Sequence, residues 1–461
     1  MLIKRSEKTR DLTEGSPIKL LTAFIIPTMF GLLFQQFYNM ADSIVVGRIL
    51  GPDALAGVGS TSSVTFFVLG FSVGVCTGFS IPVSQSFGNK DYKALRRYVG
   101  NIIFLTAAAA LIVTTVTAIL CDDILNRMHN PKETFPYAYK YLFICFLGIP
   151  ATMVYNLASS LMRAMGDSKT PLYFLLMSSL LNIILDIVLI AYTPLEVMGA
   201  ALATVISQLL AAVCAVIYMA KAFPVIRLSL QDMKPRKSEI IKLLSSGIPM
   251  GLQTSVTGIG IILLQSSIND LGPMYMTAFT AGDKVMVMMI SPMDAIGMAM
   301  AAFVGQNVGA KKLKRVHDGV KASSILGISY CALIALVAVF LGNPMVSWFL
   351  DVEKFSNAAG IITHGHNYLM INVALFLPLL YIHILRNSVQ AMGFSNFAVF
   401  GGVLELIGRG ATALFVIPHL GFAAVCFAAP AAWVLADLYL FPLYFILHKK
   451  LKKKLSLKGQ N

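Results

Sequence analysis

Charge is scarce in this 461-residue chain. Only 13% of its residues are Asp, Glu, Lys or Arg, whereas a soluble domain has roughly 25%. So few charges cannot cover a surface that faces water, so a soluble enzyme and a nucleic-acid-binding protein are excluded. Cysteine is sparse too: the six cysteines are scattered and show no CxxC or metal-ligand spacing, so we expect neither a disulfide framework nor a metal site.

Long apolar runs take the place of charge. Hydrophobic residues make up 57% of the chain, and the runs are as long as the roughly 20 residues that a helix needs to cross a bilayer. Backbone groups in lipid must bond within their own segment, so continuous helices are expected. We therefore predict an all-α polytopic membrane protein with twelve transmembrane helices. The predicted spans are residues 18–47, 54–84, 98–121, 136–162, 170–192, 197–221, 240–269, 274–307, 320–350, 357–389, 394–417 and 421–447.

The basic residues favour one side of the predicted membrane. With a cytoplasmic N-terminus, 28 of the 36 Lys and Arg residues fall in the tails and the even-numbered loops, and five fall on the opposite side. This bias predicts a multi-pass protein of the cell inner (cytoplasmic) membrane with both termini cytoplasmic. The net charge of +14 is thus a topology signal and not a nucleic-acid footprint. The basic tail Lys449–Lys458 suits either a stop-transfer signal or contact with anionic membrane lipids.

The two halves of the chain resemble each other. Five short motifs recur in the same order at offsets of 221 to 227 residues. Six spans per half give both halves the same orientation, so we predict two pseudo-symmetric six-helix bundles, an arrangement typical of secondary transporters. The predicted parts are an N-terminal tail (1–17), an N-lobe (18–221), a linker (222–239), a C-lobe (240–447) and a basic tail (448–461). The matched motifs begin at Ile26 and Ile248, Leu50 and Leu271, Val83 and Val304, Ala164 and Ala391, and Met198 and Leu420.

Ionisable residues inside a span are functional candidates, because charge is costly in the bilayer centre. Tyr38 and Asp42 share one helix face of span 1, Asn182 and Asp186 share one face of span 5, and Thr204 lies on span 6. Two carboxyls in a partly dry pocket can exchange protons, or with neighbouring oxygens they can form a cage for sodium. The structural alternative is that Asp42 lies near the outer membrane surface and Asn182 joins two helices.

These acids are not constants of the repeat. The equivalent of Asp42 in the second half is Leu263, and the equivalent of Asp186 is Ala413. A residue that only maintained the scaffold would be expected in both halves. The asymmetry therefore favours a functional role for the two acids.

The second half carries its own polar residues. Glu405 and Arg409 are spaced to pair on span 11, while Asp283, Lys284 and Asp294 lie on span 8. We expect Glu405, Arg409, Lys284 and Asp294 to form a structural polar network. Contact with substrate or coupling ion is the alternative.

A substrate cavity is the most open part of the prediction. Flexible methionines of span 8 and aromatic residues of span 1 suit varied, flat cations, but plain packing explains them equally well. Pro27 is expected to bend span 1. His364 and His366 are interpreted as a solvated loop pair, and His383 as an interior histidine with its hydrogen bonds satisfied. The candidate cavity residues are Phe34, Gln36, Phe37, Asp283, Met286 and Met289.

Several motifs in order resemble the multidrug and toxic compound extrusion (MATE) transporters, within the multidrug/oligosaccharidyl-lipid/polysaccharide exporter superfamily. They are Leu12–Ile18, Ile26-Pro27, Phe37–Asp42, Arg163–Asp167, Leu181–Asp186 and Val304–Ala310. The acids of spans 1 and 5 look like the DinF-like branch. That likeness implies a cation-coupling pocket of Tyr38, Asp42, Asn182, Asp186 and Thr204, and bending at Pro27 on protonation. The absence of an acid between Gly247 and Leu264 departs from the NorM-like branch and puts sodium coupling in the C-lobe in doubt.

The sequence therefore predicts a secondary active multidrug efflux antiporter. It would be a monomer without a cofactor and without enzymatic activity. It would export small organic cations in exchange for H⁺ or Na⁺ by alternating access. A flippase for lipid-linked oligosaccharide or polysaccharide precursors is the alternative. Such exporters usually have a more cationic cavity, and Lys284 and Arg409 are the residues that keep this alternative open.

Overall fold

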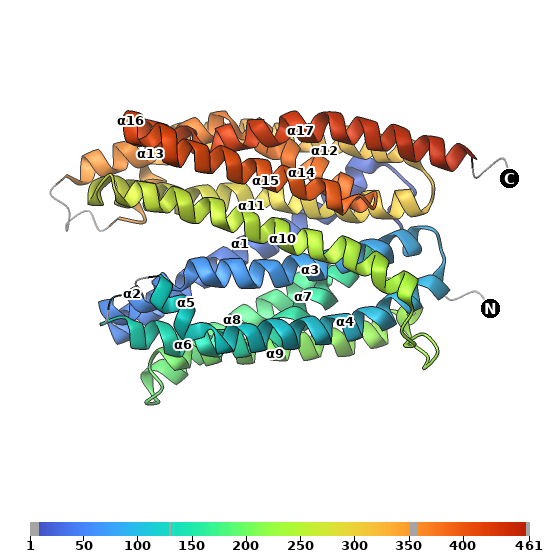
Figure 1. The fold of residues 1–461 in the computed structure, drawn as a ribbon, viewed down its shortest axis with the longest axis horizontal. Coiled ribbons are helices and arrows are strands. Elements are labelled where there is room, and N and C mark those ends of the chain that lie inside the picture. The colour runs from blue at the N-terminus through green and yellow to red at the C-terminus, as the bar shows by residue number, and fades with distance from the viewer. Residues whose placement is uncertain (1–8, 129–130, 132, 351–356, 458–461) are drawn as a thin grey trace. The chain divides into compact units, whose positions relative to one another are not determined.

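The computed structural model describes residues 9–128, 131, 133–350 and 357–457, which form helices and short connections without strands (Figure 1). The outer ends of the predicted tails, residues 1–8 and 458–461, lie outside the described residues. The first half contains α1 (Pro17–Leu50), α2 (Pro52–Ser60), α3 (Ser62–Gly88), α4 (Tyr92–Ile119), α5 (Cys121–Arg127), α6 (Phe135–Leu147), α7 (Ile149–Ala164), α8 (Lys169–Ala191) and α9 (Val197–Ala222). The linker and second half contain η1 (Pro224–Ile226), α10 (Lys237–Asn269), α11 (Pro273–Gly309), α12 (Leu313–Ser347), α13 (Ala358–Ala374), α14 (Phe376–Ala391), α15 (Ser395–Ala411), η3 (Thr412–Val416), α16 (Ile417–Leu420) and α17 (Phe422–Leu457).

The helices account for the predicted spans. Among the described residues, ten helical segments are long and apolar enough to cross a bilayer. Two more spans are bent pairs, α6 with α7 at 48° and α13 with α14 at 51°. Pro150 and Pro378 lie just after these bends, and proline lacks the N–H that would continue the helical hydrogen bonds. The all-α fold with twelve spans is confirmed, each bent pair counting as one span.

The repeat extends to the backbone of the turns. Three pairs of equivalent residues have the same positive φ, a conformation that is uncommon for residues with a side chain. They are Gly51 and Gly272 (90° and 99°), Gly166 and Gly393 (89° and 91°), and Lys90 and Lys311 (58° and 59°). The halves therefore share turn geometry as well as sequence motifs.

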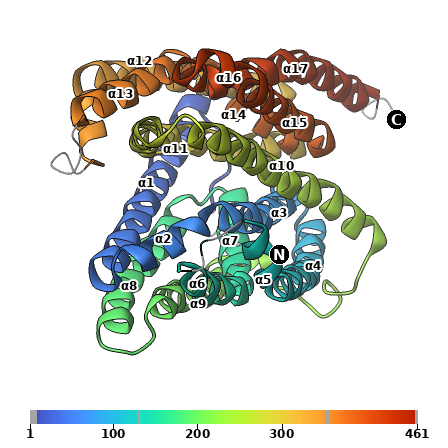
Figure 2. The ribbon, with the colours of Figure 1, turned by 60° about the vertical axis from the view of Figure 1, so that its left-hand side comes forward.

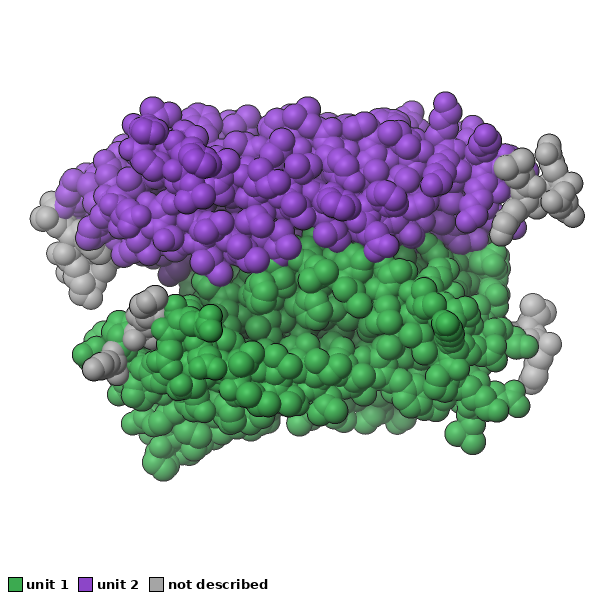
Figure 3. All heavy atoms as spheres, in the orientation of Figure 1, with its two compact units in different colours: residues 1–14, 26–255 green, residues 15–25, 256–461 purple. Residues whose placement is uncertain are grey.

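The chain forms two compact units, coloured green and purple in Figure 3, and the beginnings of α1 and α10 each belong to the unit of the other half. Unit 1 comprises residues 1–14 and 26–255, and unit 2 comprises residues 15–25 and 256–461. The predicted N-lobe and C-lobe, 18–221 and 240–447, thus differ from the units, because 18–25 belong to unit 2 and 240–255 to unit 1. In α1 the change falls directly before Pro27, which cannot donate to the carbonyl of Ala23.

Close helix packing in unit 1 depends on small residues. Figures 1 and 2 show α8 beside α9 and α3 beside α7, in agreement with their contacts. Gly78 of α3 faces the first part of α10, and a Cβ there would lie 2.5 Å from the carbonyl oxygen of Ser246. Small residues allow membrane helices to approach closely. The first part of α10 is therefore held on unit 1 by backbone-to-backbone packing.

In unit 2, α15 packs tightly on α17 and α11 packs on α14. A Cβ on Gly408 would lie 2.7 Å from the Cα of Ala432, so the axes of α15 and α17 can approach only because Gly408 lacks a side chain. Trp433 and Phe376 are buried with ring centroids 6.2 Å apart. This packing brings the polar residues of α14, α15 and α17 together.

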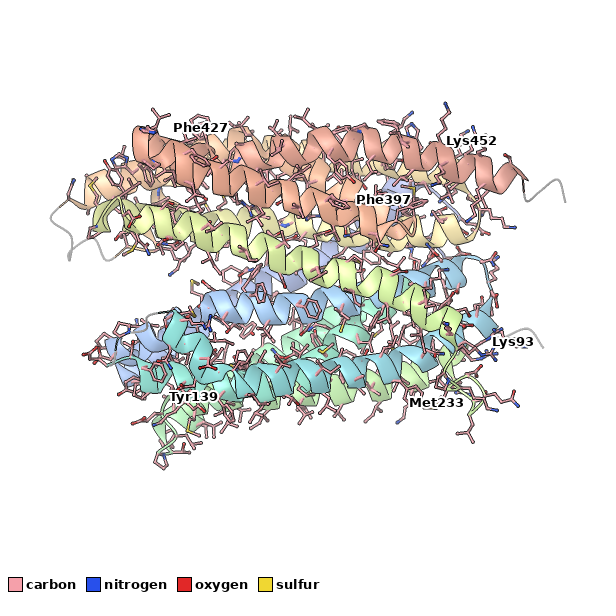
Figure 4. The ribbon with its side chains drawn as sticks, viewed as in Figure 1. Lys93, Tyr139, Met233, Phe397, Phe427 and Lys452 are labelled. Atoms are coloured by element: carbon pink, nitrogen blue, oxygen red, sulfur yellow. The ribbon has the colours of Figure 1, made fainter. Side chains whose placement is uncertain are left out.

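Each unit has a basic end. In unit 1, Lys93 and Met233 lie at one end and Tyr139 lies toward the other; in unit 2, Lys452 lies at one end and Phe427 toward the other (Figure 4). Lys93 and Lys452 come from segments that the charge bias assigned to the cytoplasm. The arrangement of each unit is consistent with that assignment, which remains a prediction.

The linker is tied to α4 at the basic end of unit 1. Arg96 Nε lies 3.5 Å from Asp232 Oδ2, and Asn101 Oδ1 accepts from the backbone N–H of Arg236 at 3.1 Å. Burial acts to raise the pKa of Asp232, but hydrogen bonds from the amide and hydroxyl of Ser229, together with nearby arginines, outweigh it and lower that pKa. The ionised Asp232 therefore helps to fasten the linker.

Candidate functional site

The predicted acids of the first half meet inside unit 1. Asp42 comes from α1 and Asp186 from α8, and their carboxyl groups lie within hydrogen-bonding reach of each other. An ionised carboxylate only accepts hydrogen bonds, so one of the two must carry a proton for this bond to form. Oδ1 of each carboxyl is buried and has no other partner among the described residues. One proton between the two groups would supply the missing donor.

Asn182 and Thr204 complete the α8 side of this acid pair. With its amide oriented to suit both neighbours, Asn182 donates to Asp186 Oδ2 at 3.3 Å and accepts from the hydroxyl and the backbone N–H of Thr204 at 3.3 and 3.2 Å. Asp186 and Asn182 are 0% and 1% exposed. The Asn182 side chain therefore links Asp186 on α8 to α9 and fixes its position.

Tyr38 lies on the α1 side, one turn before Asp42. Its side chain is hydrogen-bonded to Gln208 of α9, and the Thr152 hydroxyl of α7 donates to the same glutamine. Tyr38 and Asp42 are half-buried, unlike the fully buried Asp186. All five predicted coupling residues, including Thr204, are thus gathered at one place in unit 1.

No positive charge neutralises the acid pair. In the described part of the chain, neither Asp42 nor Asp186 forms an ion pair with Lys, Arg or His. A carboxylate pair without a basic partner attracts a proton, a metal cation or an organic cation. The arrangement is therefore chemically suited to a cation.

The predicted cavity residues divide between the units and differ in exposure. In unit 1, Phe34 and Phe37 are 45% and 51% exposed, and Gln36 is half-buried. In unit 2, Met286 and Met289 are each only 2% exposed. The two methionines match the packing alternative for span 8, and the α1 aromatics retain surface that a ligand could contact. The sixth residue of the set, Asp283, is half-buried and accepts from the Tyr368 hydroxyl at 3.4 Å.

A buried charged cluster lies in unit 2. Arg386 Nη1 of α14 donates to Glu405 Oε1 of α15 at 2.7 Å, and Arg409 Nη2 lies 3.6 Å from Glu405 Oε2. The predicted pairing of Glu405 with Arg409 is present, but the shorter bond comes from Arg386, which helix spacing could not reveal. Asp437 of α17 is 8% exposed and close enough for its charge to interact with Glu405 and Arg386.

Two members of the predicted polar network, Lys284 and Asp294, lie outside this cluster. Lys284 is exposed, with its Nζ 5.6 Å from the centroid of the Phe349 ring, so including it in a buried network was wrong. Its neighbour Asp283 points inward, because adjacent residues of a helix face different directions. Asp294 lies 3.4 Å from Nδ1 of His383.

The structure also corrects the interpretation of two histidines. His364 and His366 lie inside α13, where His364 packs against Tyr275 and Phe422 and His366 contacts the carbonyl of Ala338. They are not a solvated loop pair. His383 is buried as expected, but its Nε2 has no hydrogen-bond partner among the described residues.

Sequence reasoning missed two further residues. Arg386 and Asp437 were not among the predicted site residues, although a charge inside span 10 or span 12 is itself a signal. Unit 2 also has an apolar hollow of about 490 Å³ that contains none of the predicted site residues. Its lining residues are Leu375, Gly408, Phe427, Pro430, Ala431, Val434, Leu435 and Leu438.

Comparison with known proteins places these features in a family. The MatE family model matches residues 27–188 and again residues 249–406, once in each half of the repeat. The chain is 29% identical over 382 residues to the "probable multidrug resistance protein YpnP" of Bacillus subtilis, covering 83% of this chain and 84% of that protein. It is 26% identical over 396 residues to the "multidrug export protein MepA" of Staphylococcus aureus, covering 85% and 86%.

Solved structures show the same fold. A crystal structure of MATE in the straight conformation matches with a TM-score of 0.87 at 20% identity, over 96% of this chain and 98% of that chain. The outward-facing conformation of a multidrug resistance MATE family transporter matches with a TM-score of 0.86 at 21% identity, over 98% and 100%. At this identity the likeness establishes the fold and leaves the roles of individual residues open.

Proposed function

Because the chain belongs to the MatE family of multi-pass membrane transporters, we propose that it is a secondary active antiporter that exports organic cations in exchange for protons or sodium. The observation that carries this proposal is the contact between Asp42 and Asp186 in unit 1, two acids without a basic partner among the described residues. A multidrug resistance protein and a multidrug export protein among the relatives support the substrate class.

The acid pair provides a physical basis for exchange. When it is ionised, the pair attracts a cationic substrate; when it is protonated, that attraction is lost. A ligand shifts a conformational equilibrium only through its different affinities for the two states. Proton and substrate therefore drive the transporter in opposite directions if both compete for Asp42 and Asp186. Phe34 and Phe37, with about half of their surfaces exposed, can contact the apolar part of the substrate.

The direct contact between the two carboxyl groups favours the proton over sodium. Two carboxyls within hydrogen-bonding reach share a proton without moving, whereas a sodium ion would have to enter between them. Sodium remains the second coupling ion, because the two carboxyls offer oxygen ligands to a hard cation, and Asn182 and Thr204 can add theirs once the hydrogen bonds between them rearrange. Asp42, Asp186, Asn182 and Thr204 are the residues that would hold it.

The flippase alternative loses its main support in the structure. It depended on basic residues free to bind a pyrophosphate. Arg386 and Arg409 are both engaged by Glu405, which leaves the exposed Lys284, with no ion pair among the described residues, as the one basic residue in favour of this alternative. We therefore retain efflux as the proposed function.

We place the protein in the inner membrane of the cell as a monomer, with both termini in the cytoplasm. The basic ends of the units and the charge bias of the loops support it. Single cysteines introduced at Lys93 or Tyr139 test it by labelling from one side of intact cells. Labelling of the Lys93 position alone from outside would contradict the proposal.

Dye efflux from proteoliposomes with an imposed proton or sodium gradient tests the function. In the wild-type protein, protons that flow down the imposed gradient are expected to drive a cationic dye in the opposite direction across the membrane. Asp42→Asn and Asp186→Asn are expected to abolish this dye movement. Asp123→Asn, at an exposed acid of α5, is the matched control and should transport normally. Unchanged transport by both site variants would remove the acid pair from the mechanism.

A further inference from the structure

Asp437 of α17 is a buried acid for which the antiport mechanism has no use. Only 8% of the surface of Asp437 is exposed, and its Oδ1 is fully buried with no hydrogen-bond partner among the described residues. Burying a carboxylate without donors costs so much free energy that such a group becomes neutral or acquires a partner. The structure must therefore contain either a counter-charge for Asp437 or a proton on it.

The two arginines of the neighbouring helices are already engaged by Glu405. The charges that reach Asp437 are those of Glu405, which has the same sign, and Arg386. Arg386 is committed to Glu405 by a 2.7 Å hydrogen bond, and the second arginine, Arg409, also pairs with Glu405. An ionised Asp437 would face Glu405 and compete with it for the same guanidinium.

Two other ionisable side chains on helices that contact α17 are directed toward acids other than Asp437. Tyr368 of α13 donates to Asp283, and His383 of α14 lies against Asp294. The ionisable groups on the elements that contact α17 are His364, His366 and Tyr368 on α13, Tyr381, His383 and Arg386 on α14, Glu405 and Arg409 on α15, and His419 on α16.

We propose that Asp437 is a second proton-binding site of this protein, located in unit 2 and controlled by the Arg386–Glu405 ion pair. While Asp437 holds its proton, Arg386 of α14 stays on Glu405 of α15. When the proton leaves, the new carboxylate competes for Arg386 and favours pairing of α14 with α17. Such an exchange of ion pairs is a local change of charge, and it can shift the equilibrium between two arrangements of the packed helices.

This site is distinct from the Asp42–Asp186 pair. Proton binding at Asp437 does not depend on the proposed antiport, although any part that this proton plays in transport rests on that function. The two proposals can therefore fail separately, provided that proton binding is measured without transport.

Infrared difference spectroscopy of the purified protein in lipid nanodiscs measures the proton directly. The wild-type protein is expected to show the carbonyl band of a buried, protonated carboxylic acid that disappears at alkaline pH. Asp437→Asn should remove this band and leave the signal of the Asp42–Asp186 pair. Asp270→Asn, at an exposed acid after α10, is the matched control. A full band in Asp437→Asn would overturn the proposal.

Glu405→Gln provides a second, opposite test through the ion pair. Without the charge of Glu405, Arg386 is free to pair with Asp437, so Asp437 should ionise and its band should vanish although the residue is unchanged. A band that persists in this variant at the same pH would contradict control by Arg386.

Thermal unfolding separates proton binding from a purely structural anion. If Asp437 is protonated, the nearly isosteric Asp437→Asn should unfold within a few degrees of the wild type at neutral pH. If Asp437 is an ionised partner of Arg386, the same substitution removes one of the two carboxylates that share this buried arginine and should lower the unfolding temperature strongly. The second result would refute the proposal.

Discussion

The two units share the same repeat but carry opposite kinds of side chain at one equivalent buried position, an acid in unit 1 and an apolar residue in unit 2. In unit 1, α8 carries Asp186 in a regular helix beside Asn182, and both are almost inaccessible. In unit 2 the equivalent residue is Ala413, which lies in the π-helical segment η3 and is 1% exposed. The Ser267 hydroxyl of α10 donates to the carbonyl of Ala413 at 3.2 Å.

This difference separates scaffold from function. Turn glycines such as Gly51 and Gly272 have been kept in both halves, because the chain can change direction there only with positive φ. The acids have not been kept. Unit 1 holds two acids in contact that have no basic partner among the described residues, whereas in unit 2 the corresponding cluster pairs Glu405 with two arginines. The comparison therefore supports the proposal that cation exchange with substrate takes place in unit 1.

The largest effect is expected from breaking the ion pair of unit 2. Arg386→Gln should lower the free energy of unfolding by about 3–5 kcal/mol, because it leaves the buried Glu405 with only the longer contact to Arg409. Thermal unfolding in detergent measures the change. Lys284→Gln removes a positive charge of the same unit that is exposed and should have little effect. Similar losses in both variants would show that the short Arg386 bond has no special role.

Introducing an acid into unit 2 should be the next most damaging change. Ala413→Asp places a carboxylate at a buried position lined by apolar groups, at a cost of roughly 3 kcal/mol for a charge in the bilayer centre. Ala413→Asn is the neutral control of the same shape. An aspartate variant as stable as the wild type would mean that this position of unit 2 can accommodate an acid as well.

Replacing Pro27 should affect transport more than stability. Pro27→Ala restores a donor for the carbonyl of Ala23 at the point where α1 passes from unit 2 to unit 1. We expect efflux to fall several-fold without a loss of thermal stability, because bending of α1 becomes less favourable. Pro249→Ala in α10 tests the equivalent position. Normal efflux by Pro27→Ala would remove helix bending from the account.

The smallest effect is expected at the linker. The pKa of Asp232 is lowered in the folded protein, so the ionised carboxylate stabilises the linker at neutral pH, and this contribution is lost as the pH falls below about 4. Asp232→Asn should increase amide hydrogen exchange in residues 227–236, with a stability change below about 1 kcal/mol. The difference between variant and wild type should narrow on acidification. An equal difference at every pH would exclude the charge as its cause.

Much of this architecture follows from sequence because its signals are local. Apolar runs indicate the spans, and the spacing of Tyr38 with Asp42 and of Asn182 with Asp186 indicates which side chains share a helix face. The acid site needed only the further step of bringing α1 beside α8.

What remained hidden depends on packing between distant segments. Spacing along α15 indicated Arg409 as the partner of Glu405, but Arg386 belongs to another helix, and its shorter bond results from the packing of α14 on α15. The exchange of the first parts of α1 and α10 between the units likewise depends on glycines such as Gly78 that admit a distant helix. Neither feature has a local sequence pattern.

Proton movement driven by substrate alone tests the central claim most directly. Proteoliposomes loaded with a cationic substrate and diluted into substrate-free medium, with no imposed pH gradient, should take up protons as the substrate leaves. Asp186→Asn should show no such uptake. Substrate efflux by the wild-type protein without proton uptake would contradict proton coupling. If that efflux requires a sodium gradient, sodium is the coupling ion. Substrate efflux from the Asp186→Asn variant with normal proton uptake would contradict the assignment of exchange to the acid pair.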